Sequence, residues 1–168
     1  FRMLALFGDA VKNKGLALFP RKINGRYAMI SRQDDENLFL MYADNIRYWE
    51  DAQFLHGPRY AWELVKTGNC GSPIETDRGW LVITHGLGPM RTYCLGAMLL
   101  DLEDPLKIIG ILKEPLIFPE GRDREGYVPN VVYSCGSLVH GGRLVLAYGL
   151  SDSISVVATT DLNELLDL

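Results

Sequence analysis

The sequence has few cysteines, no long apolar run and no cluster of basic residues. Its 168 residues include three cysteines, none in a Cys-x-x-Cys pair, so neither a disulfide framework nor a structural zinc site is expected. We expect free thiols at Cys70, Cys94 and Cys135 and a reducing, cytoplasmic compartment. The longest apolar stretches, such as residues 96–102, are far shorter than the roughly 18–20 residues of a membrane span. No basic-then-apolar leader opens the chain.

A nucleic-acid partner is also not expected. The formal net charge is −4 and the sequence pI is about 5.4, whereas nucleic-acid-binding proteins carry basic patches. With 48% hydrophobic and 23% charged residues, the composition is that of a globular chain with one sizeable core. One domain is the default expectation.

Signals for helices are scarce in this sequence. The first residue of the chain is Phe1 rather than Met. The best helical candidate is a short terminal turn at residues 162–166, for which Asp161 can act as the N-cap. Residues 2–7 run directly into a turn signal at Gly8-Asp9, as if the chain began in the middle of a pattern. We therefore expect a truncated start.

A repeated plan of strand, glycine turn and strongly β-prone strand is present three times. Glycine and asparagine favour such turns because they accept positive φ at little cost, and branched and aromatic residues fit a pleated surface. The turns are Asn24-Gly25, Asp77-Arg78-Gly79 and His140-Gly141-Gly142, followed by predicted strands at residues 26–31, 80–85 and 143–148. A further strand follows each hairpin, at residues 38–43, 93–100 and 154–159, with fourth strands near 51–55 and 108–112.

The intervals between the turns favour a β-propeller. Gly79 lies 54 residues after Gly25, and Gly142 lies 63 residues after Gly79, close to the ~40–50 residues of a four-stranded blade. A β-sandwich is the all-β alternative that periodicity alone leaves open. We predict a partial propeller domain over residues 1–168, with about three four-stranded blades and the N-terminal blades missing. Its open edges favour association into a homo-oligomer.

Several segments of the chain resemble glycoside hydrolase family 130, the mannoside phosphorylases and related mannosidases. They follow the order of the family's motifs and cover nearly the whole chain, at residues 18–27, 71–76, 79–86, 99–105, 126–136 and 148–152. This resemblance implies a five-bladed propeller with the active site at its central axis. It also implies inverting transfer of a mannosyl group from a β-mannoside oligosaccharide to inorganic phosphate, which gives mannose 1-phosphate.

One motif of the family has no counterpart. The general-acid aspartate of the family belongs to a Glu-Asp-Pro-Arg motif, whereas Glu103-Asp104-Pro105-Leu106 belongs to a different, later motif. We therefore expect no catalytic residue in this chain, with the acid in missing N-terminal blades. The chain by itself is then expected to be inactive.

The resemblance places Arg32, Lys66 and His85 in a phosphate-binding cradle, with Tyr93 as a weaker candidate. Arginine grips two phosphate oxygens through its planar fork, lysine supplies a compact charge, and histidine donates a hydrogen bond or carries a charge as required. Without the family, each of the first three has an ordinary structural interpretation, as a surface arginine, a solvated loop lysine and a hydrogen-bonded structural histidine.

Three further residues are candidates for sugar contacts. Asp152 can accept hydrogen bonds from neighbouring hydroxyl groups, although an Asx-turn explains it equally well. Tyr127 and Asn130 can reach a substrate pocket or only shape the loop around Pro129. Other residues have structural interpretations. Residues 34–36 form a solvated acidic turn, and the Asp44 carboxylate ties down a hairpin beneath which Trp49 packs. Trp62 either stacks on a sugar ring or is a buried aromatic residue.

Three functions remain open at this point. The first is a phosphorylase with phosphate as co-substrate and no other cofactor or metal. The second is a β-mannosidase of the same family, which would use water and would not need the basic cradle. The third is a non-catalytic carbohydrate-binding fragment, which the absent general acid suggests.

Overall fold

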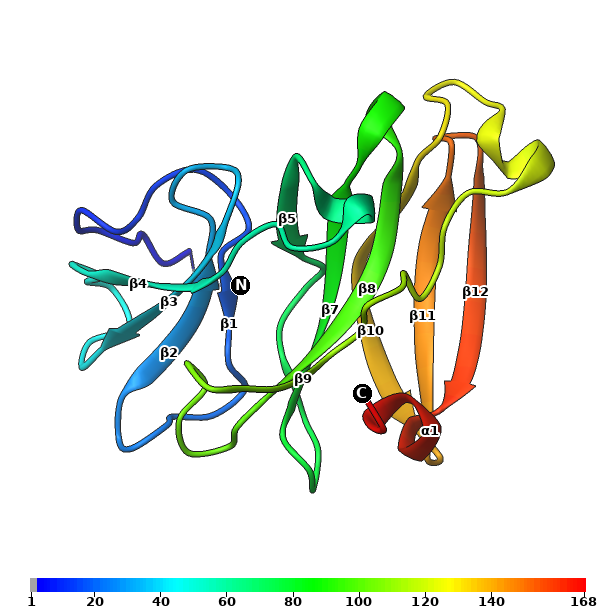
Figure 1. Ribbon diagram of the computed structural model, residues 1–168. Helices are drawn as coiled ribbons and strands as arrows, with labels where there is room; N and C mark the ends of the chain where they lie inside the picture. Colours follow the sequence, from blue (N-terminus) through cyan, green and yellow to red (C-terminus); the bar gives the residue numbers. More distant parts are fainter. Residues whose placement is uncertain (1–2) are drawn as a thin grey trace.

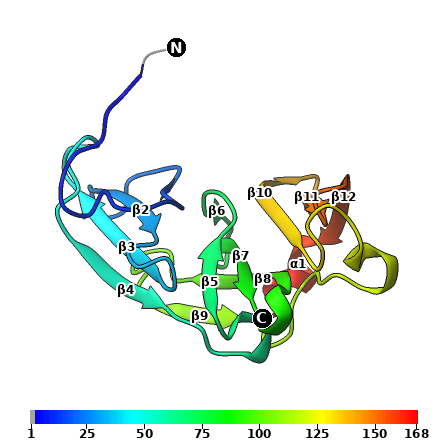
Figure 2. The same cartoon turned by 90° about the horizontal axis from the view of Figure 1, so that it is seen from above.

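The structure, a computed structural model, describes residues 3–168, which form three antiparallel sheets standing side by side in an arc (Figures 1 and 2). Phe1 and Arg2, where the expected mid-pattern start begins, lie outside the described residues. Phe7 makes a single bridge to Tyr48. The all-β prediction is confirmed.

The first and second sheets follow the predicted hairpin-plus-strand plan. The first has the order β1-β2-β3-β4, with β1 Ala17–Leu18, β2 Tyr27–Ser31, β3 Leu38–Ala43 and β4 Ala52–His56. The second has the order β5-β7-β8-β9, with β5 Lys66–Asn69, β7 Trp80–Leu87, β8 Tyr93–Leu100 and β9 Ile108–Ile111, and the short β6 Ile74–Glu75 also pairs with β7.

The third sheet has three strands in the order β10-β11-β12, at Val132–His140, Arg143–Leu150 and Ile154–Asp161. Short 3₁₀ turns lie at Ala61–Glu63 (η1), Pro89–Arg91 (η2) and Gly121–Arg124 (η3). The predicted terminal helix is α1 Leu162–Leu166, and its predicted cap is confirmed because the Asp161 carboxylate accepts hydrogen bonds from the Asn163 and Glu164 amides.

Two of the predicted turns have the positive φ values that their asparagine and glycine residues accept at little cost. Asn24 and Gly25 have φ of 49° and 79°, and Ile23 and Arg26 on either side exchange both backbone hydrogen bonds, at 2.9 and 3.0 Å. Gly141 and Gly142, with φ of 56° and 74°, connect β10 to β11. Two consecutive positive φ values are typical of the type I′ turns that suit strand twist.

The second sheet is buried on both faces, which explains why β7 is apolar almost throughout. Trp80 and Val82 pack with the first sheet's Ile30 and Leu40. The alternate residues of β7 pack with Val132, Leu144 and Leu146 of the third sheet. Because side chains alternate across a strand, one strand supplies both inter-sheet cores, and the three sheets are held in a fixed arrangement.

The expectation for Asp44 and Trp49 is half right. Trp49 is fully buried, and its indole nitrogen donates to the Ile46 carbonyl at 2.8 Å. The neighbouring Asn45, however, accepts the turn-forming bond from the Arg47 amide at 3.0 Å. The Asp44 side chain is 88% exposed and pairs with Arg26, so its assignment as the hairpin tie is wrong.

Among the described residues, no helix has both the length and the apolar character of a membrane span.

Candidate functional site

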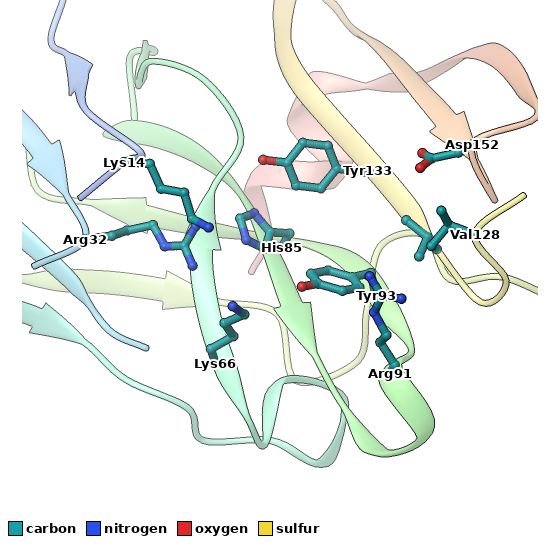
Figure 3. Close-up of a pocket in the computed structure, with 10 residues that line it drawn as sticks. Lys14, Arg32, Lys66, His85, Arg91, Tyr93, Val128, Tyr133 and Asp152 are labelled. Carbon is teal, nitrogen blue, oxygen red and sulfur yellow. The ribbon is translucent and has the colours of Figure 1, made fainter. Parts of the chain in front are cut away.

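A cavity of about 350 Å³ lies where the ends of strands from all three sheets approach one another (Figure 3). It is lined by Lys14, Arg32, Lys66, His85, Arg91, Tyr93, Val128, Val131, Tyr133 and Asp152. Five of the predicted site residues are therefore brought together from positions far apart in the sequence. The structure places all four candidates for phosphate contact, and the first candidate for sugar contact, in one pocket.

Arg32 follows β2 directly and is 3% exposed. Its side chain runs between two glycines, since a Cβ on Gly15 would lie 2.6 Å from Arg32 Cδ and one on Gly68 would lie 3.1 Å from its Cζ. Arg32 Nη2 donates to the backbone oxygen and to Oδ1 of Asp35, at 3.0 and 2.9 Å. The buried Nε has no hydrogen-bond partner within residues 3–168. The guanidinium is thus fixed in position with donor capacity to spare.

Lys66 begins β5 and does not lie in a solvated loop. Its side chain is 18% exposed, and Nζ lies 3.0 Å from Oδ2 of Asp35. Lys14 Nζ lies 3.5 Å from Oδ1 of the same carboxylate. The interpretation of residues 34–36 as a solvated acidic turn holds for Asp34 and Glu36, which are exposed, but not for Asp35, which joins three cationic side chains. The hydrogen bond from Lys66 and the nearby Arg32 lower the pKa of Asp35, which remains ionised.

His85 lies on β7 opposite Gly68 of β5 and is 2% exposed. Burial, together with the charges of Arg32 and Lys66, lowers its pKa to about 3, so the imidazole is neutral at physiological pH. Its Nδ1 lies 3.6 Å from the sulfur of Cys70, and burial raises the pKa of that thiol to about 12. His85 can therefore donate one hydrogen bond but adds no charge to the pocket.

Two tyrosines and an arginine extend the pocket. The rings of Tyr93 and Tyr133 have centroids 6.1 and 5.2 Å from that of His85, and in Figure 3 both hydroxyl groups point toward the side occupied by Arg32 and Lys66. Arg91 lies at the tip of the β7–β8 hairpin, where it and Met90 have φ of 57° and 54°. Such left-handed conformations are costly for residues with a Cβ and are enriched at functional sites.

Asp152 lies on the opposite side of the pocket from Lys14, Arg32 and Lys66, whereas Arg91 lies near Tyr93 and Val128 (Figure 3). Asp152 lies in the three-residue turn at 151–153 between β11 and β12, in which Ser151 and Asp152 have φ of 47° and 51°. The Ser151 hydroxyl donates to the Asp123 carbonyl at 2.7 Å, and the Ser151 amide donates to Val131 O at 2.7 Å. The turn that carries Asp152 is therefore anchored to the loop that contributes Val128 and Val131.

The structure does not bring Tyr127 and Asn130 into the pocket. Tyr127 is 87% exposed. The Asn130 side chain accepts a hydrogen bond from Arg124 Nε at 2.8 Å, while its backbone oxygen accepts from the Tyr93 amide at 2.9 Å. Asn130 thus supports the loop beside the pocket, and a substrate contact for either residue stays a prediction.

The arrangement suits a small oxyanion next to a polar, neutral ligand. Lys14, Arg32, Lys66 and Arg91 are cationic, and Asp152 is the one carboxylate among the residues that line this pocket in the described part of the chain. Cations at short range favour an anion, and a guanidinium and tyrosyl hydroxyls supply directional donors. The separate position of Asp152 leaves room for a ligand with hydroxyl groups. Within residues 3–168, no three metal-binding side chains gather into a candidate metal site.

Sequence reasoning missed Lys14, Arg91, Tyr133 and the two valines. Arg91 is two residues before Tyr93, but it lies in the turn before β8 with φ of 57°, so strand alternation does not point to it. Tyr133 lies in the segment 126–136 that the resemblance covers, and no local pattern singles it out. Lys14 lies in a segment with no recognisable motif, between Asn13 and Gly15, and only the fold brings it to the cluster.

The fold and the pocket define an all-β protein of side-by-side sheets with a cationic, tyrosine-lined site at the strand ends. The chain belongs to glycoside hydrolase family 130, because residues 4–168 match the family described as beta-1,4-mannooligosaccharide phosphorylase. The resemblance seen in the sequence motifs is thereby confirmed.

Individual relatives agree with this membership. A 1,2-beta-oligomannan phosphorylase of Thermoanaerobacter sp. is 40% identical over 155 residues, which are 91% of this chain and 52% of the relative. A beta-1,4-mannooligosaccharide phosphorylase of Ruminococcus albus is 34% identical over 167 residues, 92% of this chain and 50% of the relative. The chain spans about half the length of these curated relatives.

A solved structure gives the same result. The beta-1,2-mannobiose phosphorylase from Listeria innocua, in complex with beta-1,2-mannobiose, superposes with a TM-score of 0.85 at 30% identity, covering 94% of this chain and 47% of that one. The three-sheet arrangement is therefore that of a solved mannoside phosphorylase over nearly the whole of this chain.

Proposed function

We propose that this chain forms the phosphate-binding side of a β-mannoside phosphorylase. The reaction is the inverting transfer of a mannosyl group from a β-mannoside oligosaccharide to inorganic phosphate, with mannose 1-phosphate as product. Phosphate is the co-substrate, and no further cofactor is part of the proposal. A cytoplasmic location, which suits a phosphate-consuming enzyme with free thiols, stays a prediction.

The convergence of Arg32, Lys66 and His85 on one cavity is the observation that carries this proposal. In an inverting reaction, phosphate occupies the place that water takes in hydrolysis, so it must be held with one oxygen directed at the anomeric carbon. Arg32 supplies directional donors, Lys66 a compact charge and His85 a neutral N–H group. Tyr93 and Tyr133 add hydroxyl donors beside them. A hydrolase that activates water has no need of this cationic lining.

Asp152 is proposed to bind the sugar, since it lies across the pocket from Arg32 and Lys66 and its carboxylate can accept hydrogen bonds from two hydroxyl groups. The phosphate would then lie between the cationic side and the mannosyl ring. In this role Asp152 recognises substrate and transfers no proton.

The finer fold assignment is also a proposal. The three sheets of residues 1–168 are taken as blades of a five-bladed propeller, with the pocket at its axis. The arc of the sheets in Figure 2 supports it, as does the superposition on the solved relative. The general acid that protonates the leaving oxygen is proposed to come from a Glu-Asp-Pro-Arg motif outside these 168 residues.

The test uses the full-length protein with β-mannobiose, with and without inorganic phosphate. The expected product is mannose 1-phosphate, formed only when phosphate is present. Release of free mannose at the same rate without phosphate would identify a β-mannosidase instead. Binding of mannobiose with no product under either condition would favour a carbohydrate-binding protein.

A further inference from the structure

The carboxylate of Asp35 lies among the cations but is not itself one of the residues that line the cavity. Oδ1 accepts from Arg32 Nη2 at 2.9 Å and lies 3.5 Å from Lys14 Nζ, while Oδ2 accepts from Lys66 Nζ at 3.0 Å. These cations come from a loop before β1, the end of β2 and the start of β5. One carboxylate, 37% exposed, therefore joins three separate parts of the chain next to the pocket.

The loop around Asp35 is built in a way that places this carboxylate. Asp35 has φ of 65°, a left-handed conformation that aspartate and asparagine adopt more readily than other residues with a Cβ. The Asp34 carboxylate accepts hydrogen bonds from the Glu36 and Asn37 amides, at 3.0 and 2.8 Å. The Glu36 carbonyl accepts from the Thr67 amide of β5 at 2.9 Å. Asp35 is thereby held against the strand that carries Lys66.

Three cations gathered at one site repel one another unless a counter-charge lies between them. Asp35 provides that charge, and both of its oxygens are engaged by the cations that face the cavity. We propose that Asp35 is a positioning residue for the oxyanion site, holding Lys14, Arg32 and Lys66 together so that their remaining N–H groups face the phosphate. This inference rests on the proposed function.

The opposite role, in which Asp35 competes with phosphate for the cations, is disfavoured by its position. A competitor would occupy the cavity itself, whereas Asp35 is not among the residues that line it. In metal sites, residues that hydrogen-bond to the ligand-binding groups without touching the ligand orient those groups, and removing such a residue lowers the affinity for the metal about 10–100-fold. If Asp35 positions the cations, phosphate binding becomes weaker when the charge of Asp35 is removed. If Asp35 competes with phosphate for the cations, phosphate binding becomes tighter.

The experiment measures binding of inorganic phosphate to the full-length protein by titration calorimetry, for wild type, Asp35→Asn, Asp35→Glu and Asp44→Asn. Asparagine tolerates the left-handed conformation, so Asp35→Asn removes the charge while preserving the loop. Asp44→Asn makes the same chemical change in an exposed ion pair with Arg26. Phosphorolysis kinetics of the same variants give the KM for phosphate and for the mannoside.

We expect Asp35→Asn to weaken phosphate binding on the order of tenfold, with an unchanged KM for the mannoside, partial recovery in Asp35→Glu and no effect in Asp44→Asn. Phosphate binding as tight as wild type, or tighter, in Asp35→Asn would overturn the inference. An equal loss for phosphate and mannoside would also overturn it, because that result indicates a general structural defect.

The proposed function is tested separately by the wild type. If wild type binds phosphate but forms no mannose 1-phosphate, the phosphorylase assignment fails, and the comparison with Asp35→Asn still decides the role of Asp35. If wild type binds no phosphate, both proposals fail.

Discussion

Replacing Gly68 with alanine is expected to disable the oxyanion pocket while leaving the sheet intact. A Cβ at this position would lie 2.4 Å from His85 Cε1, 2.6 Å from its Nε2 and 3.1 Å from Arg32 Cζ. Gly68 is not among the glycines of the described chain that have positive φ, so alanine introduces no backbone strain. The perturbation is therefore steric and is directed at the two groups proposed to hold phosphate.

The size of the effect follows from the distances. Ordinary contacts of a Cβ begin at 3.4 Å, so the imidazole must move by 3.4 − 2.4 = 1.0 Å. A displacement of this size in a positioned group costs about 100-fold, which corresponds to roughly 2.7 kcal/mol. We expect the Kd and KM for phosphate to rise by about this factor.

Phosphate binding by calorimetry and steady-state phosphorolysis are the assays, with circular dichroism to show that the fold is retained. Gly136→Ala is the matched control, because a Cβ there meets no heavy atom within 4 Å. A folded Gly68→Ala variant with the phosphate affinity of wild type would refute the assignment of His85 and Arg32 to the oxyanion site.

Three further predictions concern the thiols, the buried histidine and the packing of the second sheet. Iodoacetamide at neutral pH should alkylate the exposed Cys135 well before Cys70, which is buried and has a pKa raised to about 12; mass spectrometry that finds Cys70 modified first would contradict this. His85 should make folding less favourable in acid, since its pKa of about 3 in the folded chain lies below the ordinary 6.5. The unfolded state therefore takes up the extra proton. The contribution of His85 to the free energy of unfolding is fully present above pH 6.5 and decreases by about 1 kcal/mol per pH unit as the pH falls toward 3. Urea unfolding of wild type and His85→Gln at pH 7 and pH 5 checks this, and an equal loss of stability in both proteins would disprove it. Gly96→Ala should destabilise the fold by about 1–3 kcal/mol, because its Cβ would lie 2.5 Å from Trp62 Cη2 and 2.9 Å from Thr84 Oγ1; an unchanged urea midpoint would show that the Trp62 ring moves freely.

The strands and turns could be predicted from local patterns because those patterns reflect local physics. The Asn24-Gly25 turn needs two positive φ values and has residues that accept them. The apolar run of β7 predicts a strand, and the structure shows that its two faces serve two different cores. How many sheets a complete ring contains is not a local property, so periodicity left the propeller and the sandwich both open.

The site was predicted from family resemblance, and the structure shows why the residues alone were insufficient. Nothing local to Lys66 distinguishes it from a solvated lysine until β5 places it beside Asp35. The same contact explains why Asp35 was misinterpreted, since an acidic turn in a sequence gives no sign of the cations that surround one of its carboxylates. Lys14 was missed for this reason as well, because its partners are distant in the chain.

The pocket draws Arg32 from the first sheet, His85 from the second and Asp152 from the third, which couples ligand occupancy to the spacing between sheets. If the two inter-sheet cores loosen, each sheet can keep its own backbone hydrogen bonds. The pocket is lost, however, because its lining residues come from different sheets. By linkage, any anion that binds only the assembled arrangement must oppose that loosening. Phosphate held at the proposed oxyanion site would then stabilise the packing of neighbouring sheets against one another.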